Sequence, residues 1–130
     1  MSTAYLDSSF LLSMILNQTD SSGLRIVLSQ YDRVVSGDLI VAECLSVARR
    51  ESFDVDAVLA VLGSVDLVHP SRSLASEIRH ALNEAYLRGA DLWHVACALF
   101  VATDSPSTIA FLSRDRSQRR VASHLGFETP

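Results

Sequence analysis

Four acidic residues, far apart in the sequence, occupy positions from which they could act as one group. They are Asp7, Glu43, Asp91 and Asp115. The first and the last follow short apolar runs at residues 4–6 and 109–112, whereas the middle two lie in early turns of segments with helical apolar spacing. Four like charges cannot sit together ionised without a cation. The pattern therefore predicts a cation site, provided that the fold brings the four acids together.

The expected cation is a hard divalent ion. Mg²⁺ takes oxygen ligands, keeps several waters and bridges to substrate phosphate, and Mn²⁺ accepts the same ligand set. Zn²⁺ fits less well, because histidines and cysteines do not cluster here with its usual spacing. A divalent ion can activate water and neutralise the charge that builds on a phosphate group in the transition state.

Positive charge gathers beside the last of these acids. The residues are Arg114, Arg116, Arg119 and Arg120. All eleven positive residues of the chain are arginine, whose planar guanidinium grips phosphate with two parallel hydrogen bonds. Basic groups that flank an acidic metal site suit a nucleic-acid backbone. Two interpretations stay open: these arginines contact nucleic acid, or they form a solvated helix face in a chain whose coding bias favours arginine.

Alternating apolar runs and amphipathic segments predict the elements that must position these side chains. Strands are expected at residues 4–6, 33–36, 65–68 and 109–112, with 127–128 as a short edge strand. Helices are expected between them, at about residues 10–16, 24–31, 39–50, 57–62, 74–88, 90–101 and 116–125. Ser8 or Ser9 is the expected N-cap of the first helix, and Gly126 the left-handed residue that ends the last.

Strands that alternate with helices predict an α/β fold, in which a parallel sheet is covered on both faces. In such sheets, sites form beyond the carboxyl ends of the strands, where the strand order reverses. Asp7 and Asp115 converge if their strands are neighbours at that reversal. Glu43 and Asp91 join them if both of their helices start at the same edge, so that four carboxylates share one pocket.

Two helices carry further expectations. The helix that begins near Gly89 is apolar on nearly every face, which is typical of a helix buried in a core. Asp91 in its first turn is open to a second interpretation, as a simple N-cap. The preceding helix is expected to run to about Arg88, with Leu82 and Tyr86 facing inward.

Length and composition limit the class of protein. The 130 residues fit one domain spanning 1–130, and no apolar run is long enough to cross a membrane. A net charge of −4 argues against a general polyanion binder. Cys44 and Cys97 lie in apolar helical patterns and no secretion signal opens the chain, which favours free, buried thiols in the cytoplasm. A disulfide between the two stays open as the alternative. Because 48% of the residues are hydrophobic, we expect part of the surface to meet another protein chain.

Taken together, the motifs resemble the PIN domain and, more narrowly, the VapC toxins of bacterial toxin–antitoxin pairs. Each motif is weak by itself, but their order and spacing over the full length are fairly specific. The resemblance rests on Tyr5-Leu6-Asp7-Ser8-Ser9, Val41-Ala42-Glu43-Cys44-Leu45, Ala90-Asp91-Leu92-Trp93-His94-Val95-Ala96, Leu112-Ser113-Arg114-Asp115, and Ala122 to Gly126 at the end of the last helix.

This resemblance implies a fold, an activity and partners. The fold is a three-layer α/β/α arrangement around a parallel sheet of about five strands in the order 3-2-1-4-5. The activity is that of an endoribonuclease dependent on Mg²⁺ or Mn²⁺, which acts in the cytoplasm as the toxin of a type II toxin–antitoxin pair. The partners are an RNA substrate, a VapB-type antitoxin that inhibits the enzyme, and a second copy of the chain in a homodimer.

Residue by residue, the acidic quartet of the family matches the four acids. Asp7, Asp91 and Asp115 would hold the metal directly or through water, and Glu43 would hold a ligand water.

Three further positions match the family pattern. Ser9 corresponds to a small polar residue near the metal, and Ser113 stands where the family commonly has threonine, so that the hydroxyl is kept. His94 matches a frequent histidine and is interpreted as a hydrogen-bonded core residue in preference to a substrate contact.

Other functions compete with this one. Phosphoacceptor receivers and aspartyl phosphatases also place acids at strand ends, but both rely on a lysine, which this sequence does not contain. Two nearer alternatives stay open: a PIN nuclease of housekeeping RNA processing, and a PIN-fold module that binds RNA or protein without cutting.

Overall fold

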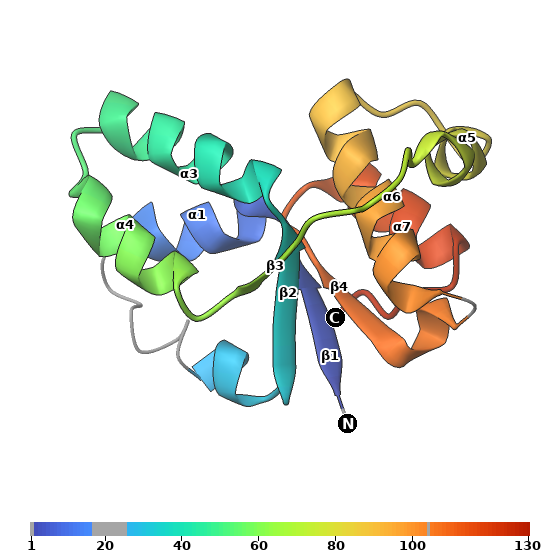
Figure 1. Ribbon diagram of the computed structural model, residues 1–130, viewed down its shortest axis with the longest axis horizontal. Coiled ribbons are helices and arrows are strands. Elements are labelled where there is room, and N and C mark those ends of the chain that lie inside the picture. The colour runs from blue at the N-terminus through green and yellow to red at the C-terminus, as the bar shows by residue number, and fades with distance from the viewer. Residues whose placement is uncertain (1, 17–25, 104) are drawn as a thin grey trace.

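Four parallel strands form the central sheet of the computed structural model, which describes residues 2–16, 26–103 and 105–130 (Figure 1). The strands are β1 (Thr3–Leu6), β2 (Arg33–Gly37), β3 (Asp66–Val68) and β4 (Ile109–Leu112). Their order in the sheet is β3-β2-β1-β4, and every neighbouring pair is parallel. The chain adds β2 and β3 on one side of β1 and β4 on the other, so the strand order reverses at β1, as the resemblance to the PIN domain implies.

The expected fifth strand is reduced to a single bridge beside β4. Glu128 forms a parallel bridge with Ala110; its carbonyl accepts from the N–H of Phe111 at 2.7 Å. Beyond it, the carbonyls of residues 129 and 130 accept hydrogen bonds from the Arg119 guanidinium. Because those carbonyls turn toward Arg119, pairing with β4 stops after one residue, and the sheet has four strands where about five are expected.

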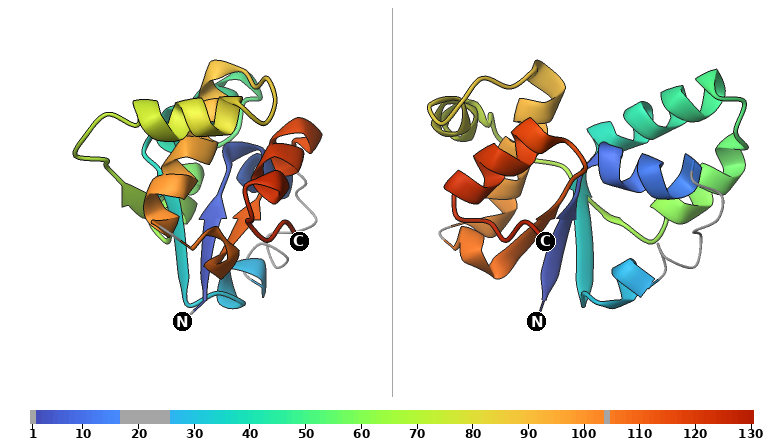
Figure 2. Two further views of the ribbon diagram at one scale, coloured as in Figure 1. Left: turned by 90° about the vertical axis from the view of Figure 1, so that its right-hand side faces the viewer. Right: turned by 180° about the vertical axis from the view of Figure 1, so that it is seen from behind.

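Helices cover both faces of the sheet. They are α1 (Ser8–Leu16), α3 (Leu39–Arg50), α4 (Val55–Leu62), α5 (Ala75–Leu82), α6 (Gly89–Ala102) and α7 (Arg116–His124), with a short 3₁₀ helix, η2 (Pro106–Thr108). Views from the front and from behind agree that α1, α3 and α4 lie on one side of the sheet and α5, α6 and α7 on the other (Figures 1 and 2). The expected three-layer α/β fold is confirmed. Of the expected second helix, residues 26–29 are helical, and Leu24 lies outside the described residues.

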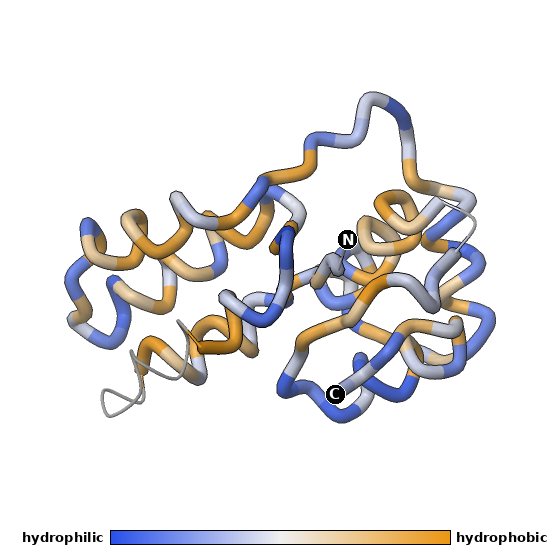
Figure 3. The backbone as a smooth tube through the Cα atoms, turned by 90° about the horizontal axis from the view of Figure 1, so that it is seen from below, coloured by the Kyte–Doolittle hydropathy of each residue, from blue (hydrophilic) through white to orange (hydrophobic). Residues whose placement is uncertain are grey.

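Alternation along the strands divides the core between the two faces of the sheet. In β1, Ala4 and Leu6 pack into the cluster formed with α1, α3 and α4, whereas Tyr5 faces the cluster around α6 and stacks on Phe111. Apolar stretches accordingly run through both helical layers (Figure 3). Nearly every residue from 92 to 99 in α6 is buried, which confirms the expected core helix.

The helix α5 ends earlier than expected, and the interpretation of its last turns is wrong. It ends at Leu82, and residues 85–88 leave it as an irregular segment. Leu82 and Tyr86, both expected inside, are 46% and 79% exposed. Leu87 occupies the core instead, and Arg88 is extended, with ψ of 155°. The chain changes direction between α5 and α6, so a helix that continued to Arg88 would leave no residues for this turn before α6 begins at Gly89.

Smaller expectations about the chain are confirmed. Gly126 has φ of 101° and ends α7 in the left-handed conformation, which glycine adopts without strain. Cys44 and Cys97 are both free and buried. No helix in the described part of the chain has the length and apolar character needed to cross a bilayer.

Candidate active site

The carboxyl ends of β1 and β4 meet at one edge of the sheet and place Asp7 there. The N–H of Asp7 donates to the carbonyl of Leu112 at 3.0 Å, which extends the pairing of the two strands by one residue. Ser113, the first residue after β4, therefore lies beside it. Asp7 is 1% exposed, so its carboxylate is a buried group that needs hydrogen-bond partners.

Residues of α1, of α7 and of the loop after β4 supply those partners. Ser9 donates its N–H to Asp7 Oδ2 at 3.1 Å and its hydroxyl to the same oxygen at 2.5 Å. Gln118 Nε2 donates to Asp7 Oδ1 at 3.3 Å, and the Ser113 hydroxyl lies 3.4 Å from Oδ2. Because the N–H of Ser9 belongs to the first turn of α1, Asp7 itself caps this helix. The expectation of a cap at Ser8 or Ser9 is wrong.

Asp115 lies at the same edge, as the N-cap of α7. Its Oδ1 accepts from the N–H of Gln118 at 2.8 Å, and its own N–H donates to the hydroxyl of Ser113 at 3.0 Å. The hydroxyls of Ser113 and Ser9 are 3.2 Å apart. The two serines that match the family pattern thus connect the two strand-end acids.

Gln118 is a buried side chain that sequence reasoning missed. It is fully buried, its Oε1 accepts from the Ser113 hydroxyl at 2.7 Å, and its Nε2 also donates to the carbonyl of Asp91 at 3.1 Å. One amide therefore joins β4, α6 and the carboxylate of Asp7. Gln118 follows the N-cap Asp115 by three residues, the spacing of a capping box, and that signal could have identified it.

Asp91 enters the edge from the first turn of α6. Arg88 is the N-cap of this helix, so the interpretation of Asp91 as an N-cap is wrong. Burial raises the pKa of Asp91, and the negative charges of Asp7 and Asp115 raise it further, while Arg88, at 3.3 Å, opposes them. Asp7 and Asp115 therefore lie close enough to Asp91 to influence its ionisation.

Glu43 approaches from the second turn of α3. Its Oε1 lies 2.5 Å from Nε2 of His94, and its side chain is 23% exposed. Burial raises the pKa of the Cys44 thiol to about 12, and the charges of Glu43 and Asp7 contribute to that rise. His94 is fully buried and hydrogen-bonded at both ring nitrogens, which makes it a core histidine, as favoured from the sequence.

The donors at this edge suit a hard divalent ion. All are carboxylate or hydroxyl oxygens, the ligand type of Mg²⁺ and Mn²⁺. Within the described residues, no three histidine, cysteine, aspartate or glutamate side chains stand close enough to enclose an ion by themselves. Mg²⁺ keeps several waters among its ligands, so an edge of separated carboxylates fits an ion held partly through water.

The arginines in α7 and in the loop just before it divide into two groups. Arg114, Arg116 and Arg119 line a hollow of about 430 Å³ beside Ser113, whereas Arg120 is exposed outside it. The guanidinium of Arg114 lies over the ring of Phe10, 5.2 Å from its centre. Arg119 donates to the carbonyls of residues 113, 129 and 130, so it holds the segment after α7 in place.

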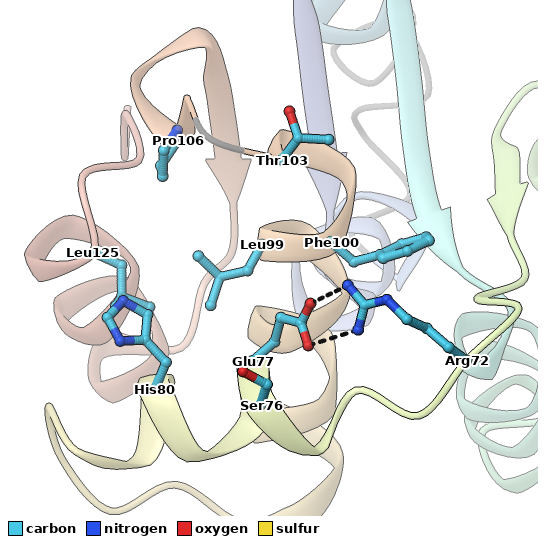
Figure 4. Close-up of a pocket in the computed structure, with 9 residues that line it drawn as sticks. All are labelled: Arg72, Ser76, Glu77, His80, Leu99, Phe100, Thr103, Pro106 and Leu125. Atoms are coloured by element: carbon cyan, nitrogen blue, oxygen red, sulfur yellow. Dashed lines mark hydrogen bonds and ion pairs between the residues drawn. The ribbon is translucent and has the colours of Figure 1, made fainter.

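A larger hollow, of about 540 Å³, lies away from the acids, among α5, α6, η2 and α7 (Figure 4). Arg72 and Glu77 form a two-pronged ion pair on its wall, with contacts of 2.6 and 3.0 Å. The Arg72 guanidinium also lies over the ring of Phe100. Its lining residues do not include Asp7, Glu43, Asp91 or Asp115. This hollow is therefore separate from the edge of the sheet that carries these four acids, which we call the acidic edge.

Comparison with known proteins identifies the family. A family profile described as the PIN domain matches residues 4–123. The chain belongs to the PIN domain family. Among solved structures, this PIN domain is similar to a chain in the structure of VapBC-1 from nontypeable Haemophilus influenzae, with a TM-score of 0.71 and 16% identity over 97% of this chain and 96% of that one. At that identity the likeness concerns the fold, and no curated protein matches.

The family assignment agrees with the arrangement at the sheet edge. PIN domains are generally nucleases. In this PIN domain, the reversal of strand order brings the ends of β1 and β4 together, and Asp7 and Asp115 stand at those ends.

Proposed function

We propose that this PIN domain is an endoribonuclease that depends on a divalent metal ion and acts as the VapC-type toxin of a toxin–antitoxin pair. The observation that carries the proposal is the gathering of Asp7, Asp91 and Asp115 around Gln118 at the carboxyl edge of β1 and β4. The amide of Gln118 donates to the Asp7 carboxylate and to the Asp91 carbonyl, and its backbone N–H donates to the Asp115 carboxylate. Carboxylates grouped in this way need a cation. The nuclease activity general to PIN domains supports hydrolysis of a nucleic acid at this edge.

Each acid has a proposed role. Asp7, Asp91 and Asp115 hold Mg²⁺ or Mn²⁺ directly or through water, and Glu43 holds a ligand water. When bound, the ion supplies activation of water and neutralisation of the charge that builds on the scissile phosphate. Ser9 and Ser113 keep the buried carboxylate of Asp7 oriented, since both hydroxyls reach its Oδ2.

The RNA backbone is proposed to lie along the start of α7. Arg114, Arg116 and Arg120 are exposed and attract phosphate without reading bases. Arg119 lines the same hollow, but its bonds to three carbonyls give it a structural share in the surface.

The proposed partners are a VapB-type antitoxin and a second copy of the chain, in the cytoplasm. The likeness of the fold to a chain of VapBC-1 supports the first. Large apolar side chains are exposed on α4, at Leu59, and around the end of α5, at Leu82 and Tyr86. Apolar surface of this kind suits contact with another protein chain.

Cleavage of total RNA tests the nuclease. We expect cleavage with Mg²⁺ or Mn²⁺, none with EDTA, and none by Asp7→Asn in either metal. Asp66→Asn is the matched control, because Asp66 is an exposed aspartate at the amino end of β3, away from the acidic edge. Equal cleavage in EDTA would exclude the metal mechanism, and equal cleavage by Asp7→Asn would exclude this edge as the site.

A further inference from the structure

A buried chain of hydrogen bonds links the end of β2 to Glu43. The N–H of Gly37 donates to the hydroxyl oxygen of Tyr5 at 3.0 Å, and that oxygen lies 2.7 Å from Nδ1 of His94. On the other side of the ring, Nε2 of His94 meets Oε1 of Glu43. Tyr5 and His94 are both fully buried, so water does not compete for these contacts.

Counting donors fixes the proton on Nε2 of His94. Ionised Glu43 only accepts, so the contact at Nε2 requires a proton on that nitrogen. In a neutral ring, Nδ1 then accepts from the hydroxyl of Tyr5, whose oxygen already accepts from Gly37. In a ring that carries protons on both nitrogens, Nε2 is again a donor. The donor toward Glu43 is therefore present in both charge states of the histidine.

Packing keeps the imidazole where it is. The ring of Tyr5 meets it edge-on, with centres 5.8 Å apart, and Trp93 does the same at 5.4 Å. Tyr5 is held in turn by its stack on Phe111, with ring planes 4° apart. At Gly37 an added Cβ would overlap the Trp93 ring, so glycine is required for this close approach.

We infer that His94 is a positioning residue for the acidic edge: it holds Oε1 of the Glu43 carboxylate and leaves Oε2 without a bond to the imidazole, while Tyr5 holds the ring. This inference rests on the proposed function, because it gives Glu43 its role toward a metal ligand. Ligating groups in metal sites are commonly oriented by such outer partners, whose loss weakens metal binding by roughly 10–100-fold. In most such sites a carboxylate orients a ligating histidine by a hydrogen bond; here the histidine would orient the carboxylate.

Mn²⁺ affinity tests this role. It is measured on the full chain without RNA, by electron paramagnetic resonance of the free ion. We expect His94→Met to weaken Mn²⁺ binding by about tenfold, close to the effect of Glu43→Gln. His94→Gln, whose amide can still donate toward Glu43, should retain most of the affinity. The double variant Glu43→Gln, His94→Met should bind no more weakly than Glu43→Gln, because His94 acts through Glu43.

Val95→Ala is the matched control for lost stability. Val95 follows His94 in α6 and is fully buried in the core cluster around this helix. We expect this variant to melt at a lower temperature and to bind Mn²⁺ as the parent does. If His94→Met binds Mn²⁺ as tightly as the parent while Glu43→Gln binds it more weakly, the inference is overturned and the proposed function still stands. No binding by the parent would overturn the proposed function, and the inference with it.

A second measurement stands if His94→Met does not fold. Nitrogen-15 shifts of the His94 ring in the parent should show a proton on Nε2, and a ring protonated only on Nδ1 would overturn the inference. Tyr5→Phe keeps the aromatic stack but removes the hydroxyl, so it should weaken Mn²⁺ binding by a smaller factor than His94→Met. Unchanged affinity in Tyr5→Phe would remove Tyr5 from the positioning chain.

Discussion

The acidic edge has two halves that are built differently. On the strand half, Asp7 and Asp115 each accept a hydrogen bond from the first turn of a helix, so their carboxylates also cap α1 and α7. On the helix half, Asp91 and Glu43 are held by the side chains of Arg88 and His94.

Because of this difference, a substitution can remove an acid without also weakening the fold only on the helix half. A carboxylate that caps a helix stabilises the fold, so removing it confounds a loss of activity with a loss of structure. An acid held by one side chain in a half-buried place stabilises the fold much less, and repulsion from neighbouring acids can make it a net cost. Substitutions on the strand half must therefore preserve the cap, whereas those on the helix half need not.

The largest effect is expected for Asp7→Asn. Asparagine caps a helix as well as aspartate does, so α1 should stay intact. Because the variant lacks one charge of the proposed metal site, we expect RNA cleavage to fall by at least about a hundredfold, beyond what changes to outer partners cost. Initial cleavage rates and thermal melts measure the two effects. Parental activity in a folded Asp7→Asn protein would contradict the role of the strand half.

Asp115 allows cap and charge to be separated at one position. Asp115→Ala loses both, whereas Asp115→Asn keeps the acceptor for the N–H of Gln118. We expect the alanine variant to be less stable than the asparagine variant by about 1 kcal/mol, with both inactive. Urea denaturation measures the difference. Equal stabilities would show that the cap contributes nothing here.

The arginines of α7 provide a parallel comparison. Arg119→Ala should destabilise the protein by about 1 kcal/mol, since Arg119 donates to three backbone carbonyls. Arg120→Ala should leave stability unchanged and reduce the slope of RNA affinity against salt by about 1. Filter binding over a range of salt concentrations, combined with melts, distinguishes them. A shifted cleavage-site preference in Arg120→Ala, with the salt slope unaltered, would indicate base contacts instead.

The smallest effect is expected on the helix half, for Asp91→Asn without metal. Because folding raises the pKa of Asp91 above its ordinary 3.8, its ionised form costs stability at neutral pH. The variant should therefore melt higher than the parent at pH 7, by roughly 2 °C. The gain should vanish as the pH falls below the ordinary pKa, where the carboxyl is protonated in both states. Mg²⁺ should stabilise the parent more than the variant. A variant that melts lower at pH 7 would show Asp91 to be a stabilising ion-pair partner of Arg88.

The strand half of the edge was the easier half to predict from sequence. Asp7 and Asp115 follow apolar runs directly, and parallel strands end at a common edge, so their convergence needed only the strand order. Asp91 and Glu43 depended on where two helices begin. Those starts were predicted well, because Gly89 and Asp38 precede apolar helical patterns.

The features that the sequence did not predict arise from contacts between residues that are far apart in the chain. Gln118 follows Asp115 at the spacing of a capping box, but that spacing does not indicate the bond from its amide to Asp7, 111 positions away. The end of α5 was mispredicted because Leu82 and Tyr86 continue an apolar pattern, while the fold places Leu87 in the core. Neither the caps shared with the acids nor the Tyr5–His94 contact can be read from local periodicity.

The acids also add to the effect of burial on the thiol of their neighbour in α3, Cys44. Burial, together with the charges of Glu43 and Asp7, raises the pKa of the Cys44 thiol to about 12. Since only the thiolate reacts with oxidants and alkylating agents, the Cys44 thiol, which stays protonated at pH 7, is unreactive in the folded chain. Cys97, with its pKa raised to about 11 chiefly by burial, is protected in a similar way. A folded chain should therefore resist peroxide and iodoacetamide, so that cysteine labelling reports unfolding.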